Sequence, residues 1–399
     1  MKHLLTTASA FALLLGLTAA PSLAEEKSAW RLFVSDHAAP VIHSINTETG
    51  QKIGTFNVKA PASLYRSDSG RTVFAVQGKG DLVSVISSGI SFGDHGDHGD
   101  IEIDAPKQLN VEFGGKKPSH FVDHEGDIAL FFDGEGKALI VSEADVLKGG
   151  AAVREVTTAA PHHGVAVAYG DHVLASEPNL ENPDELPVGI RVVDRSGAPV
   201  GDVHGCPDLH GEASSGNLLA IACAEGLLVV TANGEAPSIE LLPYDDGLPE
   251  GKSTTLVGGR GLQYFLGNYG PSAVVLIDPK SEDAFRLIDL PTRRVHFAVD
   301  PVRARFAYVF TEDGELRRID VVAGKLDGSL KLTEPYSMDG HWSDPRPRIA
   351  VAGGRIVVSD PLKGVLHIVD AESFTQSNDI ALEGKPFNLV AVGGTGETH

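Results

Sequence analysis

The stretch Arg318-Ile319-Asp320-Val321-Val322-Ala323-Gly324-Lys325-Leu326 has the form of a β-strand that ends in aspartate, a short turn with glycine and the start of a second strand. The same form returns at residues 44–53, 276–280 and 368–374. Each time an apolar run ends in Asp or Asn, and small or charged residues follow. Periodicity typical of helices is almost absent, so the chain is predicted to be all-β.

Strand-forming runs continue along the whole chain, and its 45 glycines and 23 prolines supply the turns between them. Further apolar runs cover residues 72–76, 82–86, 128–132, 173–176, 227–230, 273–277, 306–310 and 356–359. The segment that opens each unit recurs about every 40 to 50 residues, which is the length of a four-stranded β-propeller blade. These opening segments begin near Leu64, His120, His163, His210, Thr254, His296, Pro347 and Asn388.

The two ends of the chain together make one further blade. The last opening segment, at Asn388, has no room after it for three more strands, whereas residues 31–35, 41–45 and 52–58 form three strands without an opening one. We therefore expect an eight-bladed propeller whose terminal blade is shared by the N- and C-termini. Seven blades remain the alternative if the weak unit after Thr254 is not a blade.

The first 24 residues have the features of a secretory signal peptide. A single lysine, Lys2, precedes an apolar run at 11–17, and Ser22-Leu23-Ala24 is close to a small-x-Ala cleavage site. The run is too short to span a bilayer. We expect residues 1–24 to be removed, and residues 25–399 to form a single periplasmic domain that is monomeric and not inserted in a membrane.

The composition excludes several kinds of partner and chemistry. With 54 acidic and 33 basic side chains the chain has a formal net charge of −21, which argues against nucleic acid and anionic membranes and favours cations. The chain lacks the motifs for covalent haem, a nucleophile elbow, a phosphate loop and a His-Glu-x-x-His zinc helix. No motif in the sequence indicates a catalytic site, and we do not predict an enzyme.

One glycine-spaced run contains only metal-ligand side chains between its glycines. It lies in an insertion near residues 91–100 of the first full blade, and its ligand candidates are Asp94, His95, Asp97, His98 and Asp100. Imidazole and carboxylate together suit zinc, whereas the calcium-loop spacing is missing. The alternative is a flexible acidic tip whose histidines are incidental.

A second set of histidines recurs at one position of the repeat. The opening strand of each propeller blade lines the central channel, and His120, His163, His210 and His296 occupy equivalent points there. Three or four imidazoles from neighbouring strands would make a zinc site with bonds of about 2.0 to 2.1 Å. The alternative is that each histidine only satisfies backbone groups or lines a wet channel.

Several residues beside this set are weaker candidates. His124, His204 and Asp123 are second-rank ligands, and Glu212 is a further carboxylate that can bind the metal or orient an imidazole. The two cysteines, Cys206 and Cys223, are expected to form a disulfide in an oxidising compartment. A hairpin turn at residues 214–215 would place them opposite each other. The alternative is that they supply thiolates to zinc.

The exported repeat, the loop at 94–100 and the histidines His120, His163 and His210 together resemble periplasmic zinc metallochaperones of the AztD type. That resemblance extends over the mature chain. It implies a β-propeller that holds Zn²⁺ and hands it to the soluble zinc-binding protein of an ABC importer. Two alternatives stay open: an exported, lactonase-like propeller hydrolase with a metal ion in its channel, and an interaction scaffold without metal.

Overall fold

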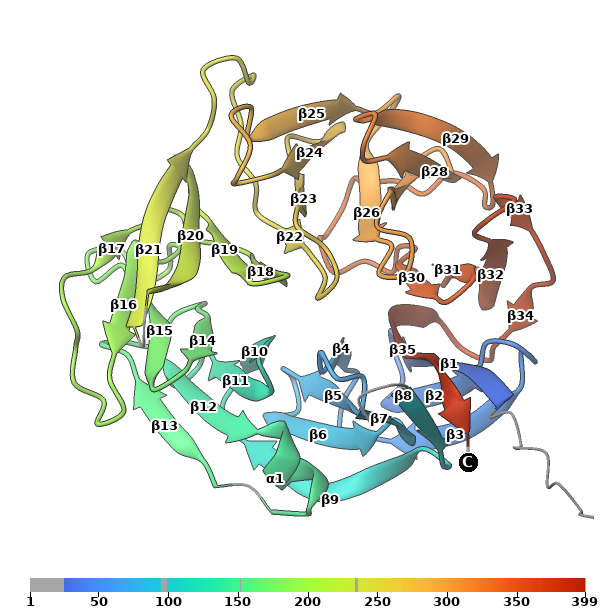
Figure 1. Cartoon of the computed structure of the whole chain (residues 1–399), viewed down its shortest axis with the longest axis horizontal. Helices are drawn as coiled ribbons and strands as arrows, with labels where there is room; N and C mark the ends of the chain where they lie inside the picture. Colours follow the sequence, from blue (N-terminus) through green and yellow to red (C-terminus); the bar gives the residue numbers. More distant parts are fainter. Residues whose placement is uncertain (1–24, 95–98, 151, 234–235, 399) are drawn as a thin grey trace, which may run out of the picture.

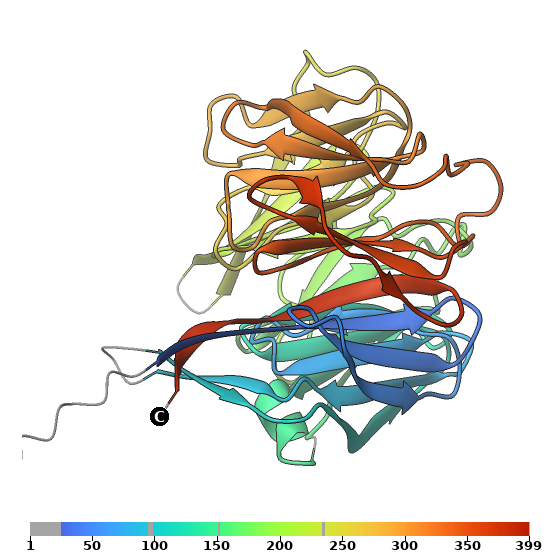
Figure 2. The ribbon, with the colours of Figure 1, turned by 90° about the vertical axis from the view of Figure 1, so that its right-hand side faces the viewer.

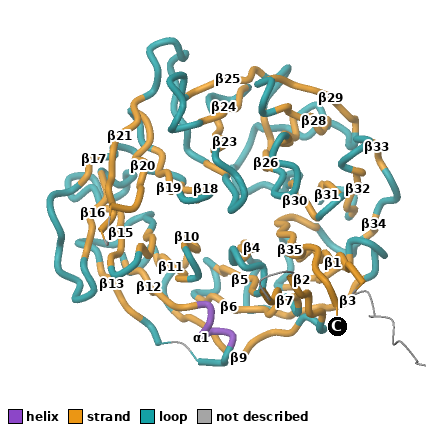
Figure 3. Tube along the Cα trace, viewed as in Figure 1, coloured by secondary structure: helices purple, strands orange, loops and turns teal. Residues whose placement is uncertain are grey.

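Eight β-sheets stand in a ring around a central axis, as the computed structural model shows for residues 25–94, 99–150, 152–233 and 236–398 (Figure 1). The predicted eight-bladed β-propeller is therefore confirmed. Within the described residues strands dominate, and α1 (Glu143–Leu147) is the one α-helix (Figure 3). None of the described helical segments has the length and apolar character needed to cross a membrane.

The first four sheets in chain order are four-stranded, and each begins with its innermost strand (Figure 1). Their strands are β4 (Ser63–Arg66), β5 (Thr72–Gln77), β6 (Leu82–Ser87) and β9 (Lys107–Gly114); β10 (Pro118–His124), β11 (Asp127–Phe132), β12 (Lys137–Ser142) and β13 (Arg154–Thr157); β14 (Ala166–Tyr169), β15 (His172–Glu177), β16 (Gly189–Val193) and β17 (His204–Gly205); and β18 (Glu212–Ser215), β19 (Leu218–Ala222), β20 (Gly226–Asn233) and β21 (Ala236–Pro243).

The next three sheets repeat this order. Their strands are β22 (Leu256–Val257), β23 (Phe265–Asn268), β24 (Ala273–Ile277) and β25 (Phe285–Asp289); β26 (Arg294–Val299), β27 (Phe306–Thr311), β28 (Glu315–Asp320) and β29 (Lys325–Lys331); and β30 (Ile349–Ala352), β31 (Arg355–Asp360), β32 (Val365–Asp370) and β33 (Thr375–Gln376), with β34 (Ile380–Ala381) also paired to β32.

The eighth sheet closes the ring with strands from both ends of the chain. Its inner strand is β35 (Pro386–Thr398), followed outward by β1 (Glu25–Asp36), β2 (Val41–Asn46) and β3 (Lys52–Asn57). β1 and β35 are antiparallel, so Glu25 lies opposite Thr398 at one end and Asp36 opposite Pro386 at the other. The shared terminal blade is thus built as the sequence predicts.

The core lies between neighbouring sheets. All six residues of β5 are buried, because a middle strand is covered by a blade on each face. Phe74 of this strand packs with Phe121 and Leu130 of the next sheet, and similar apolar clusters join the following pairs. This packing fixes the inner strands, and therefore the side chains that line the axis.

A disulfide joins Cys206 and Cys223, as predicted, but not across a hairpin. Cys206 follows β17 of the third sheet, whereas Cys223 follows β19 of the fourth. The hairpin between them turns at Gly216, which has a φ of 57°. The expected placement was wrong because the cysteines close a contact between blades. A bridge over a loop of this size stabilises the fold by about 3 kcal/mol in the chain-entropy account.

A hairpin leaves the first sheet between β6 and β9. Its strands, β7 (Ile90–Asp94) and β8 (Gly99–Ile103), extend the terminal sheet on the side of β35 that faces away from β1, where Asp100 of β8 pairs in parallel with Glu397 of β35. Figure 2 shows this hairpin projecting from one side of the ring together with the ends of β1 and β35. Residues 95–98, and with them three of the predicted loop ligands, lie outside the described residues.

Candidate metal centre

Three of the four predicted channel histidines come together at the ends of three consecutive sheets. His120 lies in β10, directly after a register shift between Pro118 and His120. His163 precedes β14 and His210 precedes β18. The repeat therefore brings them to equivalent places near the axis, one from each blade.

The rings of these histidines face one another at distances that suit a shared cation. The Nε2 atoms of His120 and His163 are 3.4 Å apart. Two nitrogens bound to one tetrahedral zinc at 2.0 to 2.1 Å are about 3.3 Å apart. The ring centroid of His163 lies 4.9 Å from that of His120 and 5.3 Å from that of His210, but His120 and His210 are 6.3 Å apart. Among the described residues no three ligand side chains already surround one point, and His210 is the ring that lies farther from His120.

Each of the three histidines has an acceptor at its other ring nitrogen. The Nδ1 atom of His163 lies 2.8 Å from Asp133 Oδ2, and that of His120 lies 3.3 Å from Glu212 Oε1. A backbone carbonyl, that of Thr254, is 2.7 Å from Nδ1 of His210. Acceptors at Nδ1 favour the tautomer with its proton there, which leaves the Nε2 lone pair free. The lone pairs of His120 and His163 then point at each other, and a cation between them removes that repulsion.

Two carboxylates give this site its negative charge. Asp133 is almost fully buried and also accepts the hydroxyl of Ser119, while the Lys117 ammonium lies 3.6 Å away. Burial acts to raise the pKa of Asp133, but the hydrogen bonds from His163 and Ser119 outweigh it and hold that pKa below its usual value. Glu212 Oε2 is buried and has no hydrogen-bond partner among the described residues. A buried carboxylate oxygen without a hydrogen-bond partner, next to the imidazole of His120, suits a nearby cation.

The imidazoles differ in their affinity for protons. Burial lowers the pKa of His120, yet the charges of Glu212 and Asp133 reverse this and the net shift is upward. For His210 burial prevails and its pKa is lowered, although the Thr254 carbonyl acts the other way. His210 therefore releases its proton more readily, and it has no carboxylate at its Nδ1.

The three histidines line a large cavity at one end of the inner strands, here called the histidine cavity. Its volume is about 1080 Å³. Its other walls include Tyr65, Arg348, Trp342 and Phe387. A bound ion would thus have one side open to this space.

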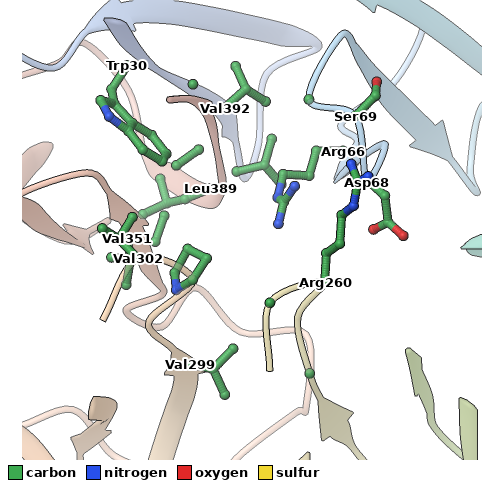
Figure 4. Close-up of a pocket in the computed structure, with 18 of the residues that line it drawn as sticks. Trp30, Arg66, Asp68, Ser69, Arg260, Val299, Val302, Val351, Leu389 and Val392 are labelled. Atoms are coloured by element: carbon green, nitrogen blue, oxygen red, sulfur yellow. The ribbon is translucent and has the colours of Figure 1, made fainter. Parts of the chain in front are cut away.

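A second cavity of about 400 Å³ lies toward the other end of the inner strands. Figure 4 shows its two walls, one apolar with Trp30 and Leu389, the other charged with Arg66, Asp68 and Arg260. No histidine lines it, so it offers little to a zinc ion.

The fourth predicted channel histidine, His296 of β26, lies in a different environment. Its Nδ1 accepts the backbone N–H of Ile349 at 3.0 Å, and its ring contact is with Phe297. Burial, together with the charges of Arg348 and Arg294, lowers its pKa well below 6.5. An imidazole that accepts at Nδ1 carries its proton on Nε2, which is the wrong tautomer for a ligand at that atom. We leave His296 out of the proposed ligand set.

The second-rank candidates lie away from the three histidines. His124 is at the far end of β10 from His120, with its ring stacked 4.8 Å from Tyr169. Its neighbour Asp123 accepts backbone N–H groups, and burial raises the pKa of Asp123 to about 6. His204 pairs with Ile190 in the outermost strand of the third sheet.

Two contributors to the site were not among the sequence candidates. Asp133 comes from the turn after β11, and a carboxylate in such a turn has no special signal in the sequence. The Thr254 carbonyl is a backbone group that any residue would supply. Glu212 was foreseen as a carboxylate that orients an imidazole, and this is how the structure places it.

No family model matches the chain. The curated protein "Zinc chaperone AztD" of Citrobacter koseri is 56% identical over 400 residues, which cover 100% of this chain and 95% of that protein. The crystal structure of Citrobacter koseri AztD matches with a TM-score of 0.92 at 56% identity, over 94% of this chain and 100% of that one. The structure of its apo form has a TM-score of 0.89 at 55% identity, over 93% and 99%. By these comparisons the chain belongs to the AztD family, whose curated member is named a zinc chaperone.

Proposed function

We propose that this protein is a periplasmic zinc chaperone. It holds one Zn²⁺ at His120, His163 and His210 and passes the ion to the soluble zinc-binding protein of an ABC importer. The observation that carries the proposal is the pair of Nε2 atoms 3.4 Å apart, with acceptors behind all three imidazoles. The curated relative is named a chaperone, and we propose no catalytic activity.

Binding uses three nitrogen ligands and leaves a fourth position open. The carboxylates of Asp133 and Glu212 make their imidazoles better donors and balance the charge of the ion. His210 completes the set by moving inward. Because strand β10 holds His120 and a hydrogen bond to Asp133 holds His163, little else has to be rearranged.

Release begins at His210. Its ring is the farther one from His120, and a neutral carbonyl rather than a carboxylate stands at its Nδ1. A ligand from the acceptor protein reaches the open face of the ion through the histidine cavity and displaces His210 first. Transfer then proceeds by ligand exchange, without free zinc.

The loop ligands Asp94, His95, Asp97, His98 and Asp100 are proposed as a separate and weaker zinc site. The strands that lead into this loop join the terminal sheet beside Glu397, opposite the start of β1, whereas Asp36 at the end of β1 lines the histidine cavity. A twelve-residue strand such as β1 spans about 36 Å. We therefore propose that the loop and the histidine cavity bind zinc as separate sites.

The proposed location rests on the N-terminal segment. Residues 1–24 lie outside the described residues, and the features of a signal peptide in their sequence support export to the periplasm. The disulfide suits the same oxidising compartment.

The test is a transfer experiment with purified, zinc-loaded protein and a zinc-free periplasmic zinc-binding protein as acceptor. We expect one tightly held zinc, and a transfer rate that rises with acceptor concentration beyond the rate of spontaneous zinc loss. The double variant H120A/H163A should hold no tight zinc, whereas the control H43A, at an exposed hydrogen bond with Thr55, should behave as wild type. Tight zinc in the double variant, or transfer no faster than dissociation to a chelator, would refute the proposal.

A further inference from the structure

Arg348 presents a guanidinium group without a partner in the histidine cavity. Its side chain makes no hydrogen bond or ion pair with any described residue, and its Nε is buried and unsatisfied. The guanidinium carbon lies 5.0 Å from the ring centroid of Phe387, which leaves the donor edge of the fork available. A cation in this position usually has an anion beside it, because an unpaired buried charge is costly.

Among the described residues no carboxylate pairs with Arg348, although Asp36 and Asp133 line the same cavity. Burial lowers the pKa of Arg348 to about 10, and the positive charge of Arg346 acts in the same direction. Arg346 is itself a cation, which donates to the carbonyls of Ser337, Asp339 and His341, and it adds to the positive charge around Arg348. Lys79 and Lys117 also line this cavity, and Lys117 lies 3.6 Å from Asp133. The two carboxylates of the lining are engaged elsewhere, Asp133 with His163 and Ser119 and Asp36 with the backbone N–H groups of residues 38 and 39. In a chain with a net charge of −21, these cations mark a local site for a negative ligand.

The remaining walls favour an organic anion over an inorganic one. Tyr65, Val76, Phe387 and the neighbouring Pro61 and Ala62 give the cavity apolar surfaces. The volume of about 1080 Å³ is far more than a single carboxylate or phosphate would fill. A ligand with a carbon chain would contact these apolar side chains, and its charged groups could still reach Arg348 and the zinc ion.

The zinc ion supplies the second anchor. With three imidazoles bound, its fourth position faces the same cavity as Arg348, and zinc accepts a carboxylate oxygen at about 2.0 to 2.2 Å. The guanidinium fork matches a carboxylate with two parallel hydrogen bonds. One molecule with two carboxylates can therefore contact both the zinc ion and Arg348 within this cavity.

We propose that the histidine cavity binds a small organic dicarboxylate, with one carboxylate on the zinc ion and the other on the guanidinium of Arg348. The zinc end of this inference rests on the proposed function, whereas the Arg348 end does not. Zinc and the dicarboxylate then strengthen each other's binding by the same factor, because the coupling between two sites is reciprocal. Loss of the dicarboxylate would open the fourth position for the acceptor protein.

The experiment is a calorimetric titration of the zinc-free and zinc-loaded protein with malonate, succinate, glutarate and adipate, and with acetate and inorganic phosphate for comparison. We expect one chain length to bind the zinc-loaded protein at least 10-fold more tightly than acetate does. The zinc-free protein should bind that same dicarboxylate more weakly but measurably. Zinc affinity should rise by the factor by which zinc tightens the dicarboxylate.

Variants assign the two ends. R348Q should lose at least 10-fold in dicarboxylate affinity and keep one zinc, whereas R260Q, in the second cavity, should match wild type. If R348Q does not fold, R348K serves instead. It keeps the positive charge but loses the forked pair of donors, and it should still weaken dicarboxylate binding several-fold.

Three results would overturn the inference. They are equal binding of acetate and every dicarboxylate, binding of phosphate alone, and full dicarboxylate binding by a folded R348Q. A protein that binds zinc but no dicarboxylate would refute this inference and leave the proposed function standing. A protein that binds the dicarboxylate but holds no zinc under any condition would refute the proposed function and leave only the Arg348 end of the inference.

Discussion

Two groups of inner-strand residues, here called the two walls, differ in charge: one contains the histidines of the histidine cavity, and the other contains His296, which does not line that cavity. On one wall, His120 and His163 are backed by the carboxylates of Glu212 and Asp133. On the other, His296 lies near Arg348, and Arg294 adds to the same positive field. Both walls have a histidine at the same position of the blade repeat. What differs is the group behind the ring, and that group decides whether an imidazole can serve as a zinc ligand.

The largest expected effect comes from removing one histidine from each wall. H163A should weaken zinc binding by more than about 100-fold, because it removes a ligand and leaves Asp133 buried without its partner. H296A should change zinc affinity less than twofold. Competition with a fluorescent zinc chelator measures both. A comparable loss in the two variants would mean that the two walls do not differ in function.

The carboxylate behind a ligand should have the next largest effect. D133N keeps the shape of the side chain but removes the charge that favours the Nδ1–H tautomer of His163, and we expect a 10- to 100-fold loss of zinc affinity. D123N is the matched control, since Asp123 accepts only backbone N–H groups away from the site. If D133N binds zinc as tightly as wild type, the carboxylate is structural only.

Acid titration should separate the walls in the zinc-free protein. The pKa of His120 is raised above 6.5, so its stabilising charge is present below that pH and is lost as pH rises through the folded pKa. The pKa of His296 lies well below 6.5, so the folded state loses stability as pH falls from 6.5 toward that value. An NMR titration of the histidine rings measures the pKa values of His120 and His296. A His296 ring protonated at pH 6.5 would contradict the assignment.

The smallest effect on the tight site is expected from the loop. Replacing His95 and His98 by serine should leave zinc affinity in the cavity within about twofold of wild type, because the strands of that hairpin join the other end of the terminal sheet. The same variant should lose a weaker, additional zinc. Calorimetric titration with more than one equivalent of zinc separates binding at the cavity from binding at the loop. Loss of the tight zinc in this variant would place the main site at the loop.

The sequence predicted the repeat better than it predicted the contacts between repeats. Eight blades, the shared terminal sheet and three converging histidines follow from a period in the chain. The position of Asp133 behind His163, and the use of Thr254 by His210, depend on how one blade packs on the next. The same limit explains the disulfide: its pairing was predicted, but Cys206 and Cys223 join neighbouring sheets instead of facing strands.

The most direct test of a three-histidine centre is anomalous diffraction at the zinc edge from crystals of the zinc-loaded protein. We expect one strong peak in the histidine cavity, about 2.0 to 2.1 Å from Nε2 of His120, His163 and His210, with an oxygen ligand on its open side. A peak bound to His296, or no peak in this cavity while the protein retains tight zinc, would contradict the account.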